Sequence, residues 1–197
     1  EDLVEELADW VRQDYGIAEG PISSVCGFLE QKGWKLIELP EGFDLNGIAG
    51  IECSRQVMFV LYPTLYVLDD FRFFMFREIA HLYLEGEDTG HTEELVCRFA
   101  RAVLFPRRLV EWEFGTKKRE VSIIELTYMK QKYGFSKRGI MTRLCELGII
   151  SKEFYDSFED LMRLHGFPKR KKIMSETLQF YENPTSYAMQ VLREESL

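Results

Sequence analysis

The stretch FRFFMFREIAHLYL (71–84) decides how this chain is expected to fold. Its first half holds four phenylalanines, Phe71, Phe73, Phe74 and Phe76, which nearly encircle a helix that turns once every ~3.6 residues. A helix that is apolar on almost every side has to be buried. We therefore predict that this helix is central to the fold and that its aromatic rings pack in the core.

The same stretch contains the pattern R-E-x-x-H, one letter away from the H-E-x-x-H of zinc proteases. In that motif two histidines on one helical face bind zinc, and the glutamate activates a water molecule. Here Arg77 stands in place of the first histidine, followed by Glu78 and His81. A second helix begins nearby with Glu93 and Glu94, and a helical hairpin would bring one of them over His81. Alone, so short a pattern fits a charged, solvated helix face better than a functional site.

Composition restricts the classes of protein that the chain can belong to. Its 197 residues suit one domain, or one domain with a small helical appendage. The net charge of −8 argues against broad, sequence-independent nucleic-acid binding. No apolar run approaches the ~20 residues of a membrane span, and the acidic start is no signal peptide, so we predict a cytoplasmic protein away from membranes. Scattered cysteines are interpreted as reduced, buried and structural: Cys26, Cys53, Cys97 and Cys145.

Hydrophobic periodicity and turn residues predict strands in the first half of the chain and helices throughout. The strands are expected to form a small antiparallel sheet. A change in composition near Gly115 predicts an α+β domain over 1–115 and a helical region over 116–197 packed on it. The expected helices cover 2–14, 21–32, 69–86, 91–105, 121–134, 136–148 and 151–166, with a last one after Pro184, and the strands cover 34–39, 47–52 and 55–62.

This order of elements resembles the ImmA/IrrE family of metallopeptidases, whose pattern is roughly F-x-x-A-H-E-x-G-H, then E-x-E-A-N-x-F-A-x-x-L-L-x-P. Phe73 falls on the leading phenylalanine of the family. The resemblance makes Glu78 the catalytic glutamate, His81 the second metal histidine and Glu93 the third metal ligand. It extends over about 1–165, and its remaining matches are Phe99, Ala100, Leu104, Pro106 and the segment KQKYGFSKRGIMTRLCELGIISKEFYDSF. The resemblance implies a zincin-like core with a small antiparallel sheet and a central motif helix.

The chain departs from the family pattern at the metal position. Arg77 replaces the first metal histidine, Phe76 replaces a small residue, and Ala80 replaces a glycine. A divalent ion and a guanidinium ~4 Å apart repel by about 8 kcal/mol at an effective dielectric near 20. That repulsion is comparable with much of the ~10–16 kcal/mol of a complete structural zinc site, so no metal cofactor is expected. We hypothesise that Arg77 instead takes over the electrostatic role of the metal by pairing with Glu93 and Glu78. The alternative is an exposed arginine without a partner.

Two functions remain open from the resemblance. The first is a catalytically degenerate regulatory or sensing module, which binds a peptide, a ligand or a helix-turn-helix repressor in a mobile-element, stress or toxin–antitoxin system. Family members often carry an upstream helix-turn-helix DNA-binding domain, and the missing initial methionine fits a chain whose upstream part was removed. The second is an active zinc metallo-endopeptidase that cleaves a repressor. Glu78 would then be its general base and His81, Glu93 and His91 its metal ligands.

Further alternatives concern single residues and assembly. His91 is expected to cap a helix or face solvent more readily than to complete a metal site, and His165 is expected at a helix end. The segment SKRGIMTRLCELGIIS has the look of a DNA-reading helix-turn-helix, but its acidic setting favours a packing role. An unrelated α+β domain with a chance pattern and a homodimer also remain open.

Overall fold

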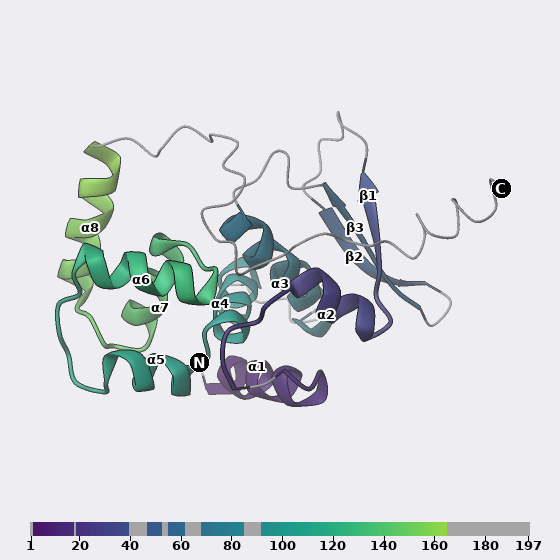
Figure 1. The fold of residues 1–197 in the computed structure, drawn as a ribbon, viewed down its shortest axis with the longest axis horizontal. Coiled ribbons are helices and arrows are strands. Elements are labelled where there is room, and N and C mark those ends of the chain that lie inside the picture. The colour runs from purple at the N-terminus through teal and green to yellow at the C-terminus, as the bar shows by residue number, and fades with distance from the viewer. Residues whose placement is uncertain are drawn as a thin grey trace.

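The computed structural model describes residues 2–17, 19–39, 47–52, 55–61, 68–84 and 92–164. This part of the chain is mostly helical, with three strands gathered at one end (Figure 1). The fold class is α+β, as predicted. In chain order the elements are α1 (Asp2–Asp14), α2 (Val25–Gln31), β1 (Lys35–Leu39), β2 (Gly47–Glu52), β3 (Arg55–Leu61), α3 (Leu68–Leu84), α4 (Thr92–Leu104), α5 (Arg107–Phe114), α6 (Ile123–Tyr133), α7 (Lys137–Glu146) and α8 (Lys152–Leu164).

The three strands form a mixed sheet in the order β1-β3-β2. Strand β2 pairs antiparallel with β3, and Ile48 lies opposite Phe59. Strand β1 pairs with the other edge of β3 and runs parallel to it, with Ile37 opposite Phe59. The prediction of an antiparallel sheet was therefore wrong for β1. The turn signals between successive strands suggested neighbours in sequence order, whereas the apolar β3 takes the central position and pairs along both edges.

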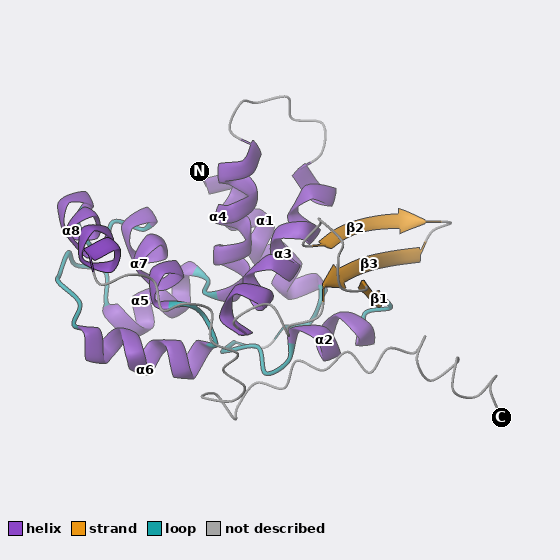
Figure 2. Ribbon diagram, turned by 90° about the horizontal axis from the view of Figure 1, so that it is seen from above, coloured by secondary structure: helices purple, strands orange, loops and turns teal. Residues whose placement is uncertain are grey.

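Helix α3 lies between the sheet and α4 in both views of the ribbon (Figures 1 and 2). Phe71 and Phe76 are fully buried, together with Met75 and Ile79 on the same helix. The prediction of a central motif helix is confirmed. Phe73 is only partly buried, and its ring stacks on Phe135 with centroids 6.4 Å apart. Two of the four phenylalanines, Phe71 and Phe76, thus lie in the core, whereas Phe73 and Phe74 are partly buried.

Local sequence signals explain several of the helix starts. Ser122 caps α6 and forms a capping box with Glu125, and Ser136 caps α7 by accepting from the Gly139 amide. The predicted opening of α2 at residue 21 was wrong. Ser24 has extended backbone angles and accepts a hydrogen bond from the Gly27 amide at 3.0 Å, so the helix begins only at the next residue.

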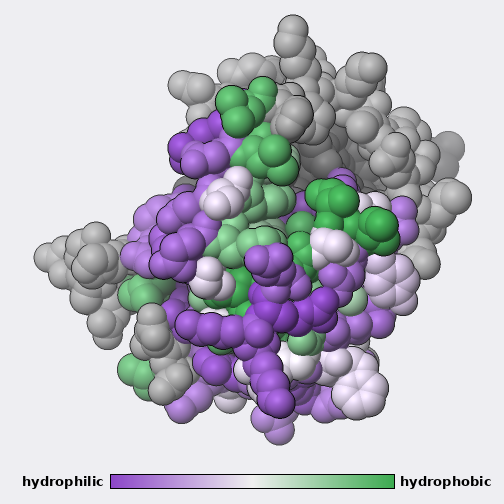
Figure 3. Space-filling view, turned by 90° about the vertical axis from the view of Figure 1, so that its left-hand side faces the viewer, coloured by the Kyte–Doolittle hydropathy of each residue, from purple (hydrophilic) through white to green (hydrophobic). Residues whose placement is uncertain are grey.

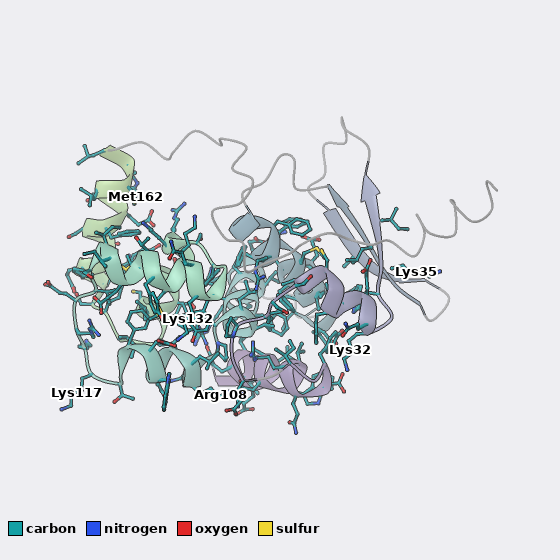
Figure 4. All side chains as sticks on the ribbon, viewed as in Figure 1. Lys32, Lys35, Arg108, Lys117, Lys132 and Met162 are labelled. Atoms are coloured by element: carbon teal, nitrogen blue, oxygen red, sulfur yellow. The ribbon has the colours of Figure 1, made fainter. Side chains whose placement is uncertain are left out.

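Helix α5 was not predicted, because Pro106 was interpreted only as the end of the preceding helix. Proline ends one helix here and also caps the next, since its fixed φ suits a helix entry. Lys132 points from α6 toward α5 (Figure 4) and donates to Glu113 Oε1 at 2.7 Å, and the Tyr133 hydroxyl donates to the same oxygen at 2.6 Å. These two bonds join α5 to α6.

Residues on both sides of the predicted boundary at Gly115 share one hydrophobic core. The ring of Phe105, at the end of α4, lies 4.3 Å from that of Tyr133 in α6. Arg143 of α7 is fully buried and donates two hydrogen bonds of 2.6 Å to the carboxylate of Glu5 in α1. The described helices after residue 116 therefore pack into the first part of the chain, and their removal would uncover its core.

The end of the molecule that carries α5, α6 and α8 exposes several apolar side chains. Apolar residues gather in the upper half of this face, with hydrophilic residues below them (Figure 3). The large exposed ones on these helices are Trp112, Ile123, Ile124, Tyr128, Leu161 and Leu164. Among the described residues, no helix is long and apolar enough to cross a membrane. The predicted tail helix and the basic run 168–172 lie outside the described residues.

Candidate functional site

The residues singled out from the sequence meet where α3 and α4 lie side by side (Figures 1 and 2). Buried side chains such as Ile79 and Ala80 on α3 and Phe99 and Ala100 on α4 hold the two helices together. Small residues at two of these positions let the helices approach closely. This packing places charged residues of both helices on one edge of the pair, where the site is built.

Arg77 bridges the two carboxylates that the sequence predicted as its partners. Its Nε donates to Glu93 Oε1 at 2.9 Å, and its Nη2 donates to Glu93 Oε2 at 2.8 Å. The remaining nitrogen, Nη1, donates to Glu78 Oε1 at 2.7 Å. The pairing with both residues is confirmed, and the alternative of an arginine without a partner was wrong. We call Arg77, Glu78 and Glu93 the charge cluster.

The three members of the charge cluster differ in their exposure to solvent. The side chains of Arg77 and Glu78 are 25% and 9% exposed, whereas that of Glu93 is 62% exposed. The guanidinium also lies over the ring of Phe74, 5.8 Å from its centroid, which is a favourable cation–π distance. Glu78 and Phe74 therefore hold Arg77 on the side that faces the protein, and Glu93 binds it on the side that faces solvent.

Burial, hydrogen bonds and neighbouring charges each shift the pKa values of the charge cluster. Burial raises the pKa of Glu78, and the charges of Arg77 and His81 only partly oppose this effect. Burial also raises the pKa of Glu93, but the hydrogen bonds from Arg77 and Cys97 outweigh it, so the net pKa lies below the usual value. Burial lowers the pKa of Arg77, yet its bonds to Glu93 reverse the balance and raise it. The cluster thus favours a charged Arg77–Glu93 pair.

Cys97 belongs to the site, although it was interpreted as a buried structural residue. It is half-buried, and its Sγ donates to Glu93 Oε1 at 3.4 Å. Burial and the neighbouring Glu93 raise the pKa of the thiol, so Cys97 stays a protonated donor near neutral pH. The spacing of four residues between Glu93 and Cys97 on one helix was the signal that could have revealed this contact. Cys26 is buried as predicted, Cys145 is half-buried, and Cys53 lies outside the described residues.

His81 lies in the last turn of α3 and is partly buried. It is near enough to both carboxylates for its charge to lower their pKa values. His91 and His165 lie outside the described residues, so the structure does not address the idea that His91 completes a metal site. The structure thus places His81 beside the charge cluster, next to Glu78 and Glu93.

The described side chains do not fit a zinc ion. Within this part of the chain, no group of three or more His, Cys, Asp or Glu is arranged to hold a metal. Both oxygens of Glu93, the expected third ligand, are engaged by Arg77. A catalytic zinc site needs three protein ligands and an open fourth position. A cation already sits between the two carboxylates, and it is the guanidinium.

Comparison with known proteins adds no relative to this description. The chain matches no protein-family model and no curated protein. Any assignment of its family therefore depends on the sequence pattern and on the charge cluster between α3 and α4.

Proposed function

We propose that the chain is a catalytically degenerate, metallopeptidase-like regulatory module, similar to the ImmA/IrrE family and derived from a zincin-type core. The observation that carries this proposal is the position of Arg77, which donates three hydrogen bonds to Glu78 and Glu93 from the place of the first metal histidine. The family pattern puts a metal ion between these carboxylates. In this chain a fixed side-chain cation supplies the positive charge instead.

The electrostatics of the charge cluster support a structural substitution for the metal. Without a cation, Glu78 and Glu93 would leave two carboxylates close together beside an apolar helix interface, one of them largely buried. Bidentate pairing with an arginine neutralises one of the two carboxylate charges. The replacement removes the repulsion between the carboxylates without the ion, so the buried apolar contacts can hold α3 and α4 together after loss of the metal ligand.

The same contacts argue against peptide hydrolysis. In a zinc peptidase, the glutamate must be able to take a proton from a metal-bound water molecule. Here Glu78 Oε1 accepts a hydrogen bond from Arg77 at 2.7 Å, and the place next to it holds a guanidinium, which provides no activated water. We therefore assign a binding or sensing role, with a peptide or a protein such as a helix-turn-helix repressor as the partner. The alternative, an active zinc endopeptidase, is decided by the experiment below.

A cytoplasmic regulator fits the remaining observations. Cys97 and Cys145 are thiols, which is typical of proteins in reducing compartments. In this proposal a DNA-binding domain upstream of residue 1 turns binding at the module into control of transcription.

Replacing one residue tests the proposal. The variant Arg77→His places a second imidazole four residues before His81, next to Glu93, and so rebuilds three zinc ligands with one open position. We expect the variant, purified without chelator, to contain about one equivalent of zinc, and the unmodified protein to contain essentially none. The measurement is elemental analysis of both proteins, purified in the same way without chelator.

A matched control separates site-specific binding from adventitious binding by a new histidine. Arg163→His introduces the same residue on the exposed end of α8 and should bind no zinc. One equivalent of zinc in the unmodified protein would support the active endopeptidase. If Arg77→His folds and still binds no zinc, the proposed descent from a metal site is wrong.

A further inference from the structure

The guanidinium of Arg77 is held in place independently of Glu93. Its Nη1 is bonded to Glu78, which is almost fully buried, and its plane lies over Phe74. The opposite edge of the guanidinium, made by Nε and Nη2, points outward to Glu93. Two parallel N–H donors in one plane match the two oxygens of a carboxylate, and this edge is preformed for such a group.

Three donors converge on the place that the Glu93 carboxylate occupies. Nε of Arg77 and Sγ of Cys97 both reach its Oε1, and Nη2 of Arg77 reaches its Oε2. The Glu93 side chain is 62% exposed, so its tie to the arginine is a surface ion pair, and surface ion pairs are weak. A carboxylate that is held weakly by firmly positioned donors is readily displaced by another carboxylate.

We propose that this place, defined by Arg77 Nε and Nη2 and Cys97 Sγ, is a binding site for a carboxylate of a partner peptide, with Glu93 as its internal occupant. The inference rests on the proposed function, because it names the ligand class of that same site. The carboxylate comes either from the C-terminus of a peptide or from an acidic side chain. When it binds, Glu93 swings out to solvent, and the tie between α3 and α4 through Arg77 is released.

A carboxylate suits this site better than a doubly charged phosphate. Glu78 already pairs with Arg77, and Glu94 adds a further negative charge beside Glu93 on the same turn of α4. A second full negative charge would be repelled by these carboxylates. A single planar anion keeps the local charge that Glu93 now provides, and His81 is close enough to favour it electrostatically.

Three small probes test the proposal on the full chain. N-acetylglycine presents a peptide C-terminus. The α-N-methylamide of N-acetylglutamate has its main-chain carboxyl blocked and presents only an acidic side chain. N-acetylglycinamide is the neutral control. The readout is the Nε–Hε signal of Arg77 in nitrogen–proton NMR spectra, assigned by its loss in Arg77→Gln. We expect the carboxylate probes to shift this signal saturably and the amide to leave it unchanged.

Removing the internal occupant should strengthen binding. In Glu93→Ala the probes no longer compete with an attached carboxylate, and we expect their dissociation constant to fall about two- to fivefold, as suits a weak exposed pair. Glu94→Ala removes the same charge one residue further along and is expected to change the dissociation constant by less than about 1.5-fold. In the double variant Glu93→Ala/Arg77→Gln, probe-dependent shifts of the neighbouring Cys97 amide should vanish. Glu93→Gln serves in place of the alanine variant if the latter does not fold.

Each outcome decides a different point. A stronger response to N-acetylglycine assigns the site to peptide C-termini, and a stronger response to the glutamate probe assigns it to acidic side chains. No saturable shift in Glu93→Ala, or an equal shift with the amide, overturns the carboxylate site. If Arg77→His nevertheless gains zinc, the proposed function stands and only this inference falls. If zinc is not gained either, the proposed function fails with it.

Discussion

Replacing Glu5 by glutamine is expected to lower the free energy of unfolding by about 3–5 kcal/mol, because it removes one partner of a buried ion pair. Both Nη atoms of Arg143 donate to the Glu5 carboxylate at 2.6 Å, and the arginine side chain is completely buried. Without that charge, the guanidinium would retain the Phe105 carbonyl and a contact of 3.6 Å to Glu146. The pair joins α1 to α7 across 138 positions of sequence, so its loss weakens the whole fold.

Equilibrium denaturation with urea measures this effect. The matched control is Glu6→Gln, which makes the same change one residue further along on the exposed side of α1 and should shift the free energy by less than about 0.5 kcal/mol. The double variant Glu5→Leu/Arg143→Met replaces both charges with apolar side chains and should recover part of the loss, because Arg98 still loses its 3.4 Å contact with Glu5. Equal effects of Glu5→Gln and Glu6→Gln would mean that the ion pair adds nothing to stability.

The same pair has a pH dependence of definite sign. Burial raises the pKa of Glu5, but the hydrogen bonds and charge of Arg143 outweigh it, so the folded-state pKa lies below the usual value. A carboxylate with a lowered pKa stabilises the folded state above its unfolded pKa of about 4.3. The contribution is lost as the pH falls through the folded-state pKa. Stability should therefore decrease below about pH 4.5, and the decrease should be shallower in Glu5→Gln, as urea midpoints between pH 2 and 7 would show.

Local chemistry accounts for the part of the fold that the sequence predicted well. The helices that start at Ser122 and Ser136 follow from caps whose partners lie three residues away. The parallel pairing of β1 with β3 depends on contacts between distant segments, for which periodicity carries no signal. The burial of arginine side chains in the core could not be predicted from the sequence either. Arg12 donates to the Val103 carbonyl 91 positions away, and nothing near it in sequence marks it as a core residue.

In the candidate site too, the sequence predicts contacts between residues on neighbouring elements but not the burial that results from packing. The pairing of Arg77 with Glu78 and Glu93 was predictable, because one partner is adjacent and the other follows a single helical hairpin. The exposure of these groups was not predictable, since it depends on how α3 and α4 pack. Glu78 is buried and Glu93 is exposed, and the proposed carboxylate site depends on this difference.

Replacing Phe105 by alanine is expected to cost about 3–5 kcal/mol, the usual range for a large aromatic side chain removed from a core. The ring is completely buried, 4.3 Å from Tyr133 and 6.4 Å from Phe114 between centroids. Its removal leaves a cavity where the end of α4, α5 and α6 meet. Trp112→Ala removes a larger aromatic side chain from α5, but that side chain is 82% exposed, so the change should stay within about 0.5 kcal/mol.

The shape of the unfolding curve of Phe105→Ala tests whether the predicted boundary at Gly115 separates two folding units. Phe105 precedes this boundary and Tyr133 follows it, yet their rings pack against each other. If the two parts fold as one unit, circular dichroism and tryptophan fluorescence should report a single transition that moves as a whole. Two transitions, of which only one moves, would mean that the helices after residue 116 form a separate domain. The shared core and the ion pair between Glu5 and Arg143 favour the single transition, because each links the two parts through buried groups.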